Sequence, residues 1–481
     1  MKQRDINVEK RFLSKESRFS AKGQVGLPAG MDDIGRVVDI CAAAEVTDTE
    51  ITDGKLEARG VVRLCITYIS RDGAVCGFAS ETLFSGAVSS AELSADMEKL
   101  VSVRCGNISY RVLDSATIEV EIGLVMNAEA ACNRAISVAD PAEEGIFAKE
   151  TELELPVLIC EKTVKTYPRT TVSADIKGDV ISSWGNAVIE KIRPEDGRVA
   201  VEGRLWLNAV CPTGDPKRPV MLVSRKAPFG ELIEAEGVRE NDNIAVTCSV
   251  ERVGARPAGD GVEIAAVVSV CCRAVRLLRE TVATDMYSSR TELKPVVAEL
   301  PLTQEGGSEA SVRTVTAETK LPEGHAPVEE PLFARGSANI TELRRERGTA
   351  EVQGAIDVSL CYMSPEAGIR SAAVSAPFTE KLAMTRGETE CTAEVLSVVC
   401  TGSGSELTLA CEMAFGLSGG EKKLVPVVID AEEGEARKKQ SPGITLVLNG
   451  GDRDPFEIGR ELGIDPADAQ IRDGNMRIIR K

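Results

Sequence analysis

The sequence predicts a mainly β protein made of three repeated antiparallel β-sandwich or barrel-like domains, followed by a small β-α-α-β domain. Three observations lead to this prediction. Apolar and polar residues alternate with a period of two over many short runs, as in strands with one buried face. The same pattern returns three times along the chain. The C-terminal segment then changes to a helical pattern with clear start and stop signals.

The composition limits the possible classes of function. The 481-residue chain is 43% hydrophobic but only 4% aromatic, so its cores must consist mainly of Val, Ile, Leu and Ala. Its net charge of −18 disfavours nucleic acid and anionic lipid as partners. The opening residues, MKQRDINVEKRF, lack the apolar run of a secretion signal, and no run is long enough for a transmembrane segment. We therefore expect a cytoplasmic protein.

The cysteines predict buried thiols and no metal site. All 14 are scattered within apolar runs, no C-x-x-C spacing occurs, and the single histidine, His325, lies in a loop-like segment. These spacings do not fit a zinc site, and reduced cysteines often serve as small apolar core residues. The sequence thus predicts neither a metal nor a cofactor. Adjacent Cys271 and Cys272 are expected to point to opposite faces of one strand.

Three strands that each begin at a glycine define the repeat. They read GVVRLCITY from Gly60, GRLWLNAVC from Gly203 and GAIDVSLCY from Gly354. Alternate positions are apolar, which predicts one buried face per strand. The residues predicted on these buried faces are Val62, Leu64, Ile66 and Tyr68; Leu205, Leu207, Ala209 and Cys211; and Ile356, Val358, Leu360 and Tyr362. Trp206 lies on an outward face, either as an exposed contact or as a cover over a seam between domains.

A second strand in each copy ends in a phenylalanine, which is Phe84, Phe229 or Phe378. The separations from glycine to phenylalanine are 24, 26 and 24 residues, with turn signals such as SRDGA, TGDPKRP and SPEAG between the strands. We interpret the aligned glycines and phenylalanines as structural positions and the phenylalanines as core anchors. A shared ligand pocket is the less favoured alternative.

The repeat and the change in composition set the predicted boundaries. The three β-domains are expected at residues 1–140, 141–285 and 286–429. Residues 430–443, DAEEGEARKKQSPG, are charged and lack apolar periodicity, so they are predicted to form a linker. The remaining residues, 444–481, form the predicted β-α-α-β domain.

Capping signals predict the helices of this last domain. Asp454 is a suitable N-cap, Pro455 occupies the first helical position, and Glu457 follows at the capping-box position. Gly463 can adopt the left-handed conformation that ends a helix. The same start signal recurs from Asp465 as DPAD, which predicts a second helix, and MRII is the predicted closing strand.

This C-terminal segment resembles a LysM domain. The family pattern is a strand, GDTLWDIAKRLG, a second helix and a last strand ending in GQKLLI; the counterparts here are Gly451–Asp452, PFEIGRELG and GNMRII. The chain departs from the pattern with GDRD for GDT, Pro455 for the usual Leu, and a shortened region after the second helix that lacks the familiar Asn. The resemblance implies partner-binding loops formed by Asp452, Arg453, Asp454, Pro455, Phe456, Arg472, Asp473 and Gly474.

The three repeats resemble the SPOCS domain of spore coat assembly proteins in endospore-forming bacteria. The resemblance rests on the glycine-led strand, the PF element, the DGKLEARG turn and the Leu-Pro pairs Leu27–Pro28 and Leu321–Pro322. Three such copies followed by LysM is the layout of SipL-like spore coat morphogenetic proteins. It implies a non-catalytic adaptor in the mother-cell cytoplasm at the forespore surface. Its LysM-like end would bind the coat ATPase that polymerises on the forespore membrane.

Peptidoglycan binding is the alternative function, because it is the commoner role of LysM domains. It needs a groove for N-acetyl sugars between the loops Gly451–Phe456 and Gln470–Gly474. The altered GDRD, the shortened second loop and the lack of an export signal count against it. Enzymatic function is not expected, because neither a phosphate-binding loop nor a G-x-S-x-G nucleophile motif occurs. Carboxylates such as Glu119 and Glu121 alternate along a strand, which is typical of a solvated face.

Overall fold

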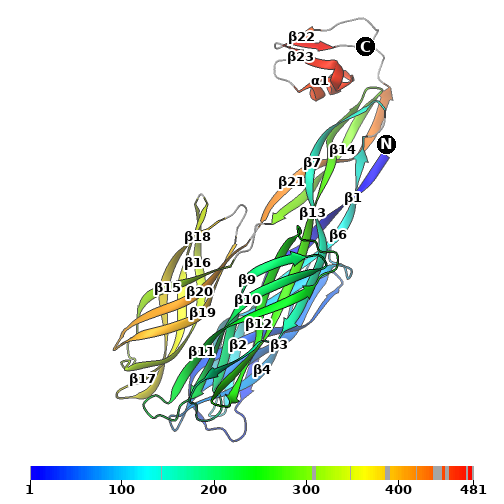
Figure 1. Ribbon diagram of the computed structural model, residues 1–481. Helices are drawn as coiled ribbons and strands as arrows, with labels where there is room; N and C mark the ends of the chain where they lie inside the picture. The colour runs from blue at the N-terminus through cyan, green and yellow to red at the C-terminus, as the bar shows by residue number, and fades with distance from the viewer. Residues whose placement is uncertain are drawn as a thin grey trace.

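The computed structural model confirms a mainly β protein built from antiparallel sheets (Figure 1). The structure describes residues 2–141, 144–305, 310–346, 348–384, 390–418, 420–436, 447–449, 454–472 and 475–478.

Unit 1 contains two three-stranded sheets packed face to face. Their orders are β1-β6-β5 and β2-β3-β4, and all pairings are antiparallel. The edges of the two sheets also meet, β1 beside β4 and β2 beside β5, so the unit is a sandwich that nearly closes into a barrel. Its strands are β1 (Lys2–Gly26), β2 (Ile34–Thr52), β3 (Lys55–Ser70), β4 (Val75–Ser89), β5 (Glu98–Val112) and β6 (Thr117–Asp140).

Unit 2 repeats this topology, with sheets β12-β13-β7 and β11-β10-β9, and with the short β8 also paired to β13. Its strands are β7 (Ile146–Thr166), β8 (Arg169–Ser173), β9 (Ser182–Glu195), β10 (Arg198–Pro212), β11 (Val220–Glu234), β12 (Asn243–Ala258) and β13 (Gly261–Ser288).

Unit 3 has the same order, but the first and the last of its strands along the chain are each divided in two. The sheets are β15-β20-β19 and β16-β17-β18, and β14 pairs separately with β21. The strands are β14 (Thr291–Glu305), β15 (Ala310–Lys320), β16 (Glu330–Glu346), β17 (Thr349–Ser364), β18 (Gly368–Ala383), β19 (Glu390–Ser403), β20 (Glu406–Ser418) and β21 (Gly420–Ala436).

The glycine and phenylalanine of each repeat face one another across adjacent strands. Gly60 pairs with Phe84, Gly203 with Phe229, and Gly354 with Phe378. A Cβ atom added to any of these glycines would lie 2.5–2.7 Å from the phenylalanine ring, so only glycine leaves room for it. All three rings are buried, which confirms their predicted role as core anchors. The predicted buried faces of the three glycine-led strands are also confirmed.

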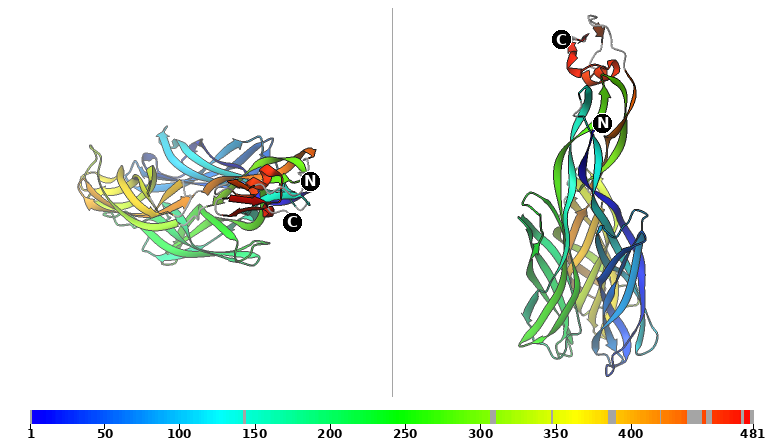
Figure 2. Two further views of the ribbon diagram at one scale, coloured as in Figure 1. Left: turned by 90° about the horizontal axis from the view of Figure 1, so that it is seen from above. Right: turned by 90° about the vertical axis from the view of Figure 1, so that its right-hand side faces the viewer.

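A stalk joins the three units. The first and last strands of each unit run beyond its sandwich as a two-stranded ribbon, and the three ribbons twist together (Figures 1 and 2). They share one apolar core, to which every unit contributes: Ile6, Val8, Val138, Leu153, Leu155, Val282, Leu300, Val425 and Val427. At the end of the stalk away from the C-terminus, the sandwiches of all three units contact one another (Figure 2).

The predicted linker is partly a strand of this stalk. β21 continues through Asp430 to Ala436 and pairs there with β14 as far as Thr291. The sequence did not predict this strand because the segment is charged and lacks apolar alternation. A two-stranded ribbon exposes much of its surface, so its strands can carry many charged residues. Residues 437–443 lie outside the described residues.

The C-terminal module lies at the far end of the stalk from the sandwiches (Figure 1). It contains β22 (Val447–Asn449), α1 (Pro455–Leu462), a 3₁₀ turn at Pro466–Asp468, β23 (Ala469–Arg472) and β24 (Asn475–Ile478). The predicted β-α-α-β order is therefore wrong in one respect. The second helix is a single 3₁₀ turn, because the next four residues form β23 and pair with β24. The sheet order is β22-β24-β23.

Candidate functional site at the end of the stalk and between the units

Helix α1 begins and ends where its capping residues predict. The Asp454 carboxylate accepts a hydrogen bond from the Phe456 amide at 3.0 Å, and Pro455 is the first helical residue. Gly463 ends the helix with φ of 63°, and its amide donates to the Gly459 carbonyl. The helix therefore has a fixed length and a defined buried face.

That buried face packs on the tip of the unit 2 ribbon. Tyr287, at the end of β13, lies between Phe147 of β7 and Phe456 of α1, with both ring centroids 5.3 Å from its own. Its hydroxyl donates to the Ile464 carbonyl, and the side chain is only 1% exposed. Gly459 allows this approach, because an added Cβ would collide with the tyrosine hydroxyl.

Two ion pairs surround the aromatic contact. Arg460 on α1 pairs with Asp285 on β13, and Lys149 on β7 approaches Asp454 at 3.5 Å. These side chains are partly or largely exposed, so each pair contributes little on its own. Together with the buried rings they orient the module on the stalk.

The predicted partner-binding residues divide into four groups. Asp454 and Pro455 lie exposed at the start of α1. Phe456 is 8% exposed because its ring faces Tyr287, so it supports the module's position in this structure. Arg472 ends β23. Outside the described residues lie Asp452, Arg453, Asp473 and Gly474.

The seam between units 1 and 3 contains a well-formed ion pair. The Arg335 guanidinium donates to both Asp39 carboxylate oxygens, at 2.7 and 3.0 Å, and to the Ile40 carbonyl at 2.8 Å. The pKa of Arg335 is raised although burial opposes this, because the Asp39 charge stabilises the guanidinium. Arg36 adds a hydrogen bond to the Ser371 carbonyl at 2.7 Å.

The seam between units 1 and 2 contains buried charges. Arg273 is 5% exposed and pairs with Glu161 of its own unit at 2.9 Å and with Glu9 of unit 1. Burial raises the pKa of Glu161, and the Arg273 charge opposes this rise. Lys165 links the same units, at 2.9 Å from Glu45 and 2.6 Å from Glu251.

Trp206 closes the seam between units 2 and 3. It is 5% exposed, packs with Leu396 of unit 3, and donates its indole N–H to Glu412 at 3.1 Å. Lys226 also pairs with Glu412, at 2.5 Å. Of the two interpretations left open by the sequence, the structure thus favours the cover over a seam. Trp184, predicted from the sequence as a core residue, lies half-buried in an apolar cluster shared by all three units.

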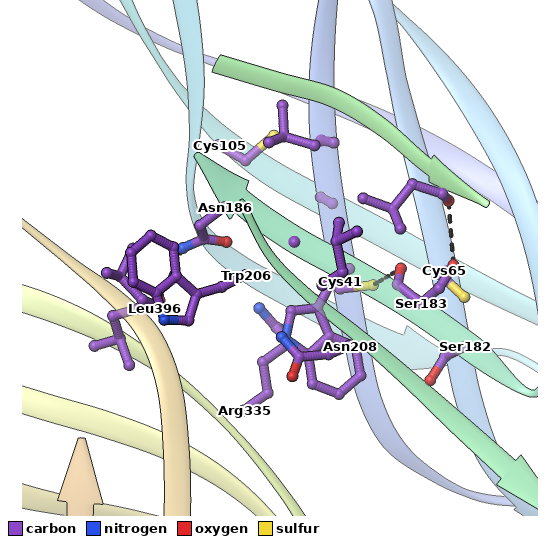
Figure 3. Close-up of a pocket in the computed structure, with 18 of the residues that line it drawn as sticks. Cys41, Cys65, Cys105, Ser182, Ser183, Asn186, Trp206, Asn208, Arg335 and Leu396 are labelled. Atoms are coloured by element: carbon purple, nitrogen blue, oxygen red, sulfur yellow. Dashed lines mark hydrogen bonds between the residues drawn. The ribbon is translucent and has the colours of Figure 1, made fainter. Parts of the chain in front are cut away.

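A cavity of about 1150 Å³ lies between the units (Figure 3). Residues of all three units line it, among them Cys41 and Cys65 of unit 1, Asn208 of unit 2, and Arg335 and Glu394 of unit 3. Asn208 is buried and its Nδ2 has no hydrogen-bond partner among the described residues. In the part of the chain that the structure describes, no cluster of His, Cys, Asp or Glu is arranged to hold a metal ion.

These features define a class of protein, in which three equivalent β-units meet at one end of a common stalk and a separate terminal module lies at the other end. Two segments, residues 33–113 and 178–257, match the model of the family described as SipL, SPOCS domain. The matches span β2 to β5 of unit 1 and β9 to β12 of unit 2. Neither unit 3 nor the C-terminal module lies within them, so the third copy and the LysM resemblance stay predictions. No curated protein and no solved structure matches the chain.

Among the described residues, no helix is both long and apolar enough to cross a membrane.

Proposed function

We propose that this chain is a non-catalytic adaptor in endospore coat assembly, acting at the forespore surface in the mother cell. The two SPOCS segments carry this proposal, because the family implies a role in spore coat morphogenesis. The arrangement of the chain supports it. Three units joined by one stalk provide a large scaffold, and the separate module lies at the end of the stalk farthest from the sandwiches (Figure 1).

The C-terminal module is the part that we propose binds the coat ATPase. Asp454 and Pro455 are exposed at the start of α1. The sequence positions Asp452, Arg453, Asp473 and Gly474 belong to the two loops that correspond to the LysM binding loops. Contacts from Tyr287 orient the module, which reduces the conformational entropy lost on binding.

Co-purification with the coat ATPase tests this assignment. A chain that ends at Ala436 keeps β21 and the whole stalk but lacks the module. We expect this truncation to abolish co-purification, and the charge reversals Arg453→Glu and Asp473→Lys to weaken it. The matched control is Lys217→Glu, an exposed residue in the turn between β10 and β11. Unchanged co-purification of the truncated chain would overturn the assignment.

Binding to purified cell wall distinguishes the alternative function. A peptidoglycan-binding protein would give saturable binding by the full chain that is lost in the truncated chain. The proposed adaptor gives no such difference. The departures from the LysM pattern at Arg453 to Pro455 favour a protein partner over a sugar chain.

A further inference from the structure

Two cysteines face one another on adjacent strands beside the central cavity. Cys41 on β2 and Cys65 on β3 are directly opposite in the antiparallel register, and both line the cavity. Directly opposite residues in such a pair have Cα atoms about 4.5–5.5 Å apart. That separation lies within the range of about 4.4–6.8 Å that a disulfide can bridge.

The surroundings of the two thiols come from all three units (Figure 3). The Cys41 sulfur lies 4.0 Å from the Ser183 carbonyl oxygen, and the Cys65 sulfur lies 3.9 Å from that of Ile181, both in unit 2. Two opposite charges act on both thiols: the Arg335 guanidinium of unit 3 lowers their pKa values, and the Asp39 carboxylate that pairs with it raises them.

The two thiols are not equivalent. A hydrogen bond from Cys41 lowers the pKa of Cys65, whereas the same contact and burial raise the pKa of Cys41. Cys65 is therefore the better nucleophile, with Cys41 placed to react with its oxidised sulfur. Cys105, which also lines the cavity, differs because burial raises its pKa to about 12 and keeps it protonated.

We propose that Cys41 and Cys65 form a reversible disulfide when the chain meets a hydroperoxide such as hydrogen peroxide. The Cys65 thiolate attacks one peroxide oxygen and breaks the O–O bond, which gives a sulfenic acid and, after proton uptake, one water. The Cys41 sulfur then attacks the Cys65 sulfur. The S–S bond forms, the S–O bond breaks, and the hydroxyl leaves as a second water with the proton of the Cys41 thiol. The two sulfurs together lose two electrons to the peroxide.

The position on adjacent strands makes this disulfide easy to reduce. Opposite residues have Cβ atoms about 4.5–5.5 Å apart, whereas a relaxed disulfide prefers about 3.8 Å. The bridge therefore draws β2 and β3 together, and strained disulfides of this kind are the labile ones. Closure also removes both S–H groups from the unit 2 carbonyls, so oxidation acts on the seam between units 1 and 2.

Peptide mapping of the full-length reduced chain tests the proposal. After brief treatment with hydrogen peroxide, the remaining thiols are alkylated under denaturing conditions and the chain is cut with trypsin. Cys41 falls in the peptide of residues 37–55 and Cys65 in that of residues 64–71, each with a single cysteine. We expect these two peptides linked, with two fewer alkylated thiols among the 14. Dithiothreitol should restore both.

The serine variants identify the role of each sulfur. In Cys41→Ser, Cys65 has no partner and should accumulate as a sulfenic acid that a dimedone probe traps. In Cys65→Ser, Cys41 should stay reduced at the same peroxide dose. Recovery of both wild-type peptides in alkylated form after peroxide treatment would overturn the proposal. Linkage of either one to a different cysteine would do the same.

Discussion

At the scale of single residues, the glycine–phenylalanine pair explains the most regular feature of the sequence. The separations of 24, 26 and 24 residues place the two residues opposite one another on the two arms of a hairpin. The sequence predicts the buried phenylalanine, since an aromatic residue recurs at the same place in the second strand of each repeat. It could not reveal why glycine is required, because that depends on how the ring lies across the neighbouring strand.

Substitution of Gly203 tests this explanation. Gly203→Ala should lower the free energy of unfolding by about 1–3 kcal/mol, because the new Cβ overlaps the Phe229 ring and the Val188 carbonyl. Gly254→Ala is the matched control in the same unit, since nothing lies within 4 Å of its added Cβ. Urea unfolding of the two variants measures the difference, and equal stability would contradict the explanation.

Glu394 should make the stability of the chain depend on pH. Its side chain reaches solvent inside the cavity, but the surrounding units enclose it, and this burial raises the carboxyl pKa although Arg104 opposes the rise. Folding therefore favours the protonated form. The protonated Glu394 carboxyl contributes fully to stability below the pKa of a glutamate in the unfolded chain, which is about 4.3. This contribution is lost as the pH rises through the higher pKa of the folded state.

Glu394→Gln should remove this loss of stability with rising pH, because the glutamine side chain does not ionise. We expect the variant to gain thermal stability over the wild type as pH increases from about 4 towards neutrality. Glu366→Gln, in the exposed turn between β17 and β18, should show no comparable trend. Melting temperatures across this pH range provide the measurement, and a parallel pH dependence for the wild type and Glu394→Gln would refute the assignment.

At the scale of elements, the long strands have two parts with different surroundings. The β1–β6 register shifts between Arg11 and Leu13, and the β13–β7 register shifts between Ala274 and Val275. In unit 3 the first strand is instead divided into β14 and β15, and the last strand into β20 and β21. Such irregularities change the local twist of a ribbon, so each marks where the strands leave the sandwich for the stalk.

The sequence predicts strands inside the sandwiches better than in the stalk or the module. Alternation is clear where one face meets a core and the other meets solvent, but each stalk ribbon buries only a small part of its surface against the other two and does not keep that period. In the C-terminal module, the Asp-Gly pair at Asp473–Gly474 between QIR and NMRI is a hairpin signal, and it competes with the weak helix signal at Asp465. Nothing in the sequence pattern pointed to Tyr287 as the residue that holds α1.

Tyr287 is therefore the residue to change at this scale. Tyr287→Phe should cost about 0.5–1.5 kcal/mol, because it removes only the hydrogen bond to the Ile464 carbonyl. Tyr287→Ala should release the module by also removing the ring contacts with Phe147 and Phe456. Limited proteolysis after Ala436 should then be faster. Tyr167→Ala, at a residue that is 63% exposed, is the control and should leave the cleavage rate unchanged.

At the scale of the whole molecule, the three seams decide how the units are arranged. Arg335 and Asp39 are 296 residues apart in the chain, and Arg273 and Glu9 are 264 apart. Ion pairs between residues so far apart in the sequence produce no periodic pattern. Each of these charged residues, considered alone, looks like an ordinary strand residue. The repeat thus predicts what each unit contains, whereas the contacts between units are visible only in three dimensions.

The Arg335–Asp39 pair should hold units 1 and 3 together. Arg335→Ala should destabilise the chain by about 1.5–3 kcal/mol, since it leaves a nearly buried carboxylate without its partner. Arg344→Ala, whose partner Glu342 lies on the exposed surface, should change stability by less than about 1 kcal/mol. A double-mutant cycle with Asp39→Ala isolates the coupling. A coupling energy near zero would show that the pair does not stabilise the seam.

We propose that the terminal module binds the coat ATPase while the three units serve as its scaffold. The decisive measurement is the affinity for the purified, immobilised ATPase, compared between the full chain and the chain ending at Ala436. We predict saturable binding by the full chain and none by the truncated chain at the same concentrations, with both chains showing the same unfolding transition for the β-units. Equal affinity of the two chains would contradict the claim and place the binding surface on the β-units.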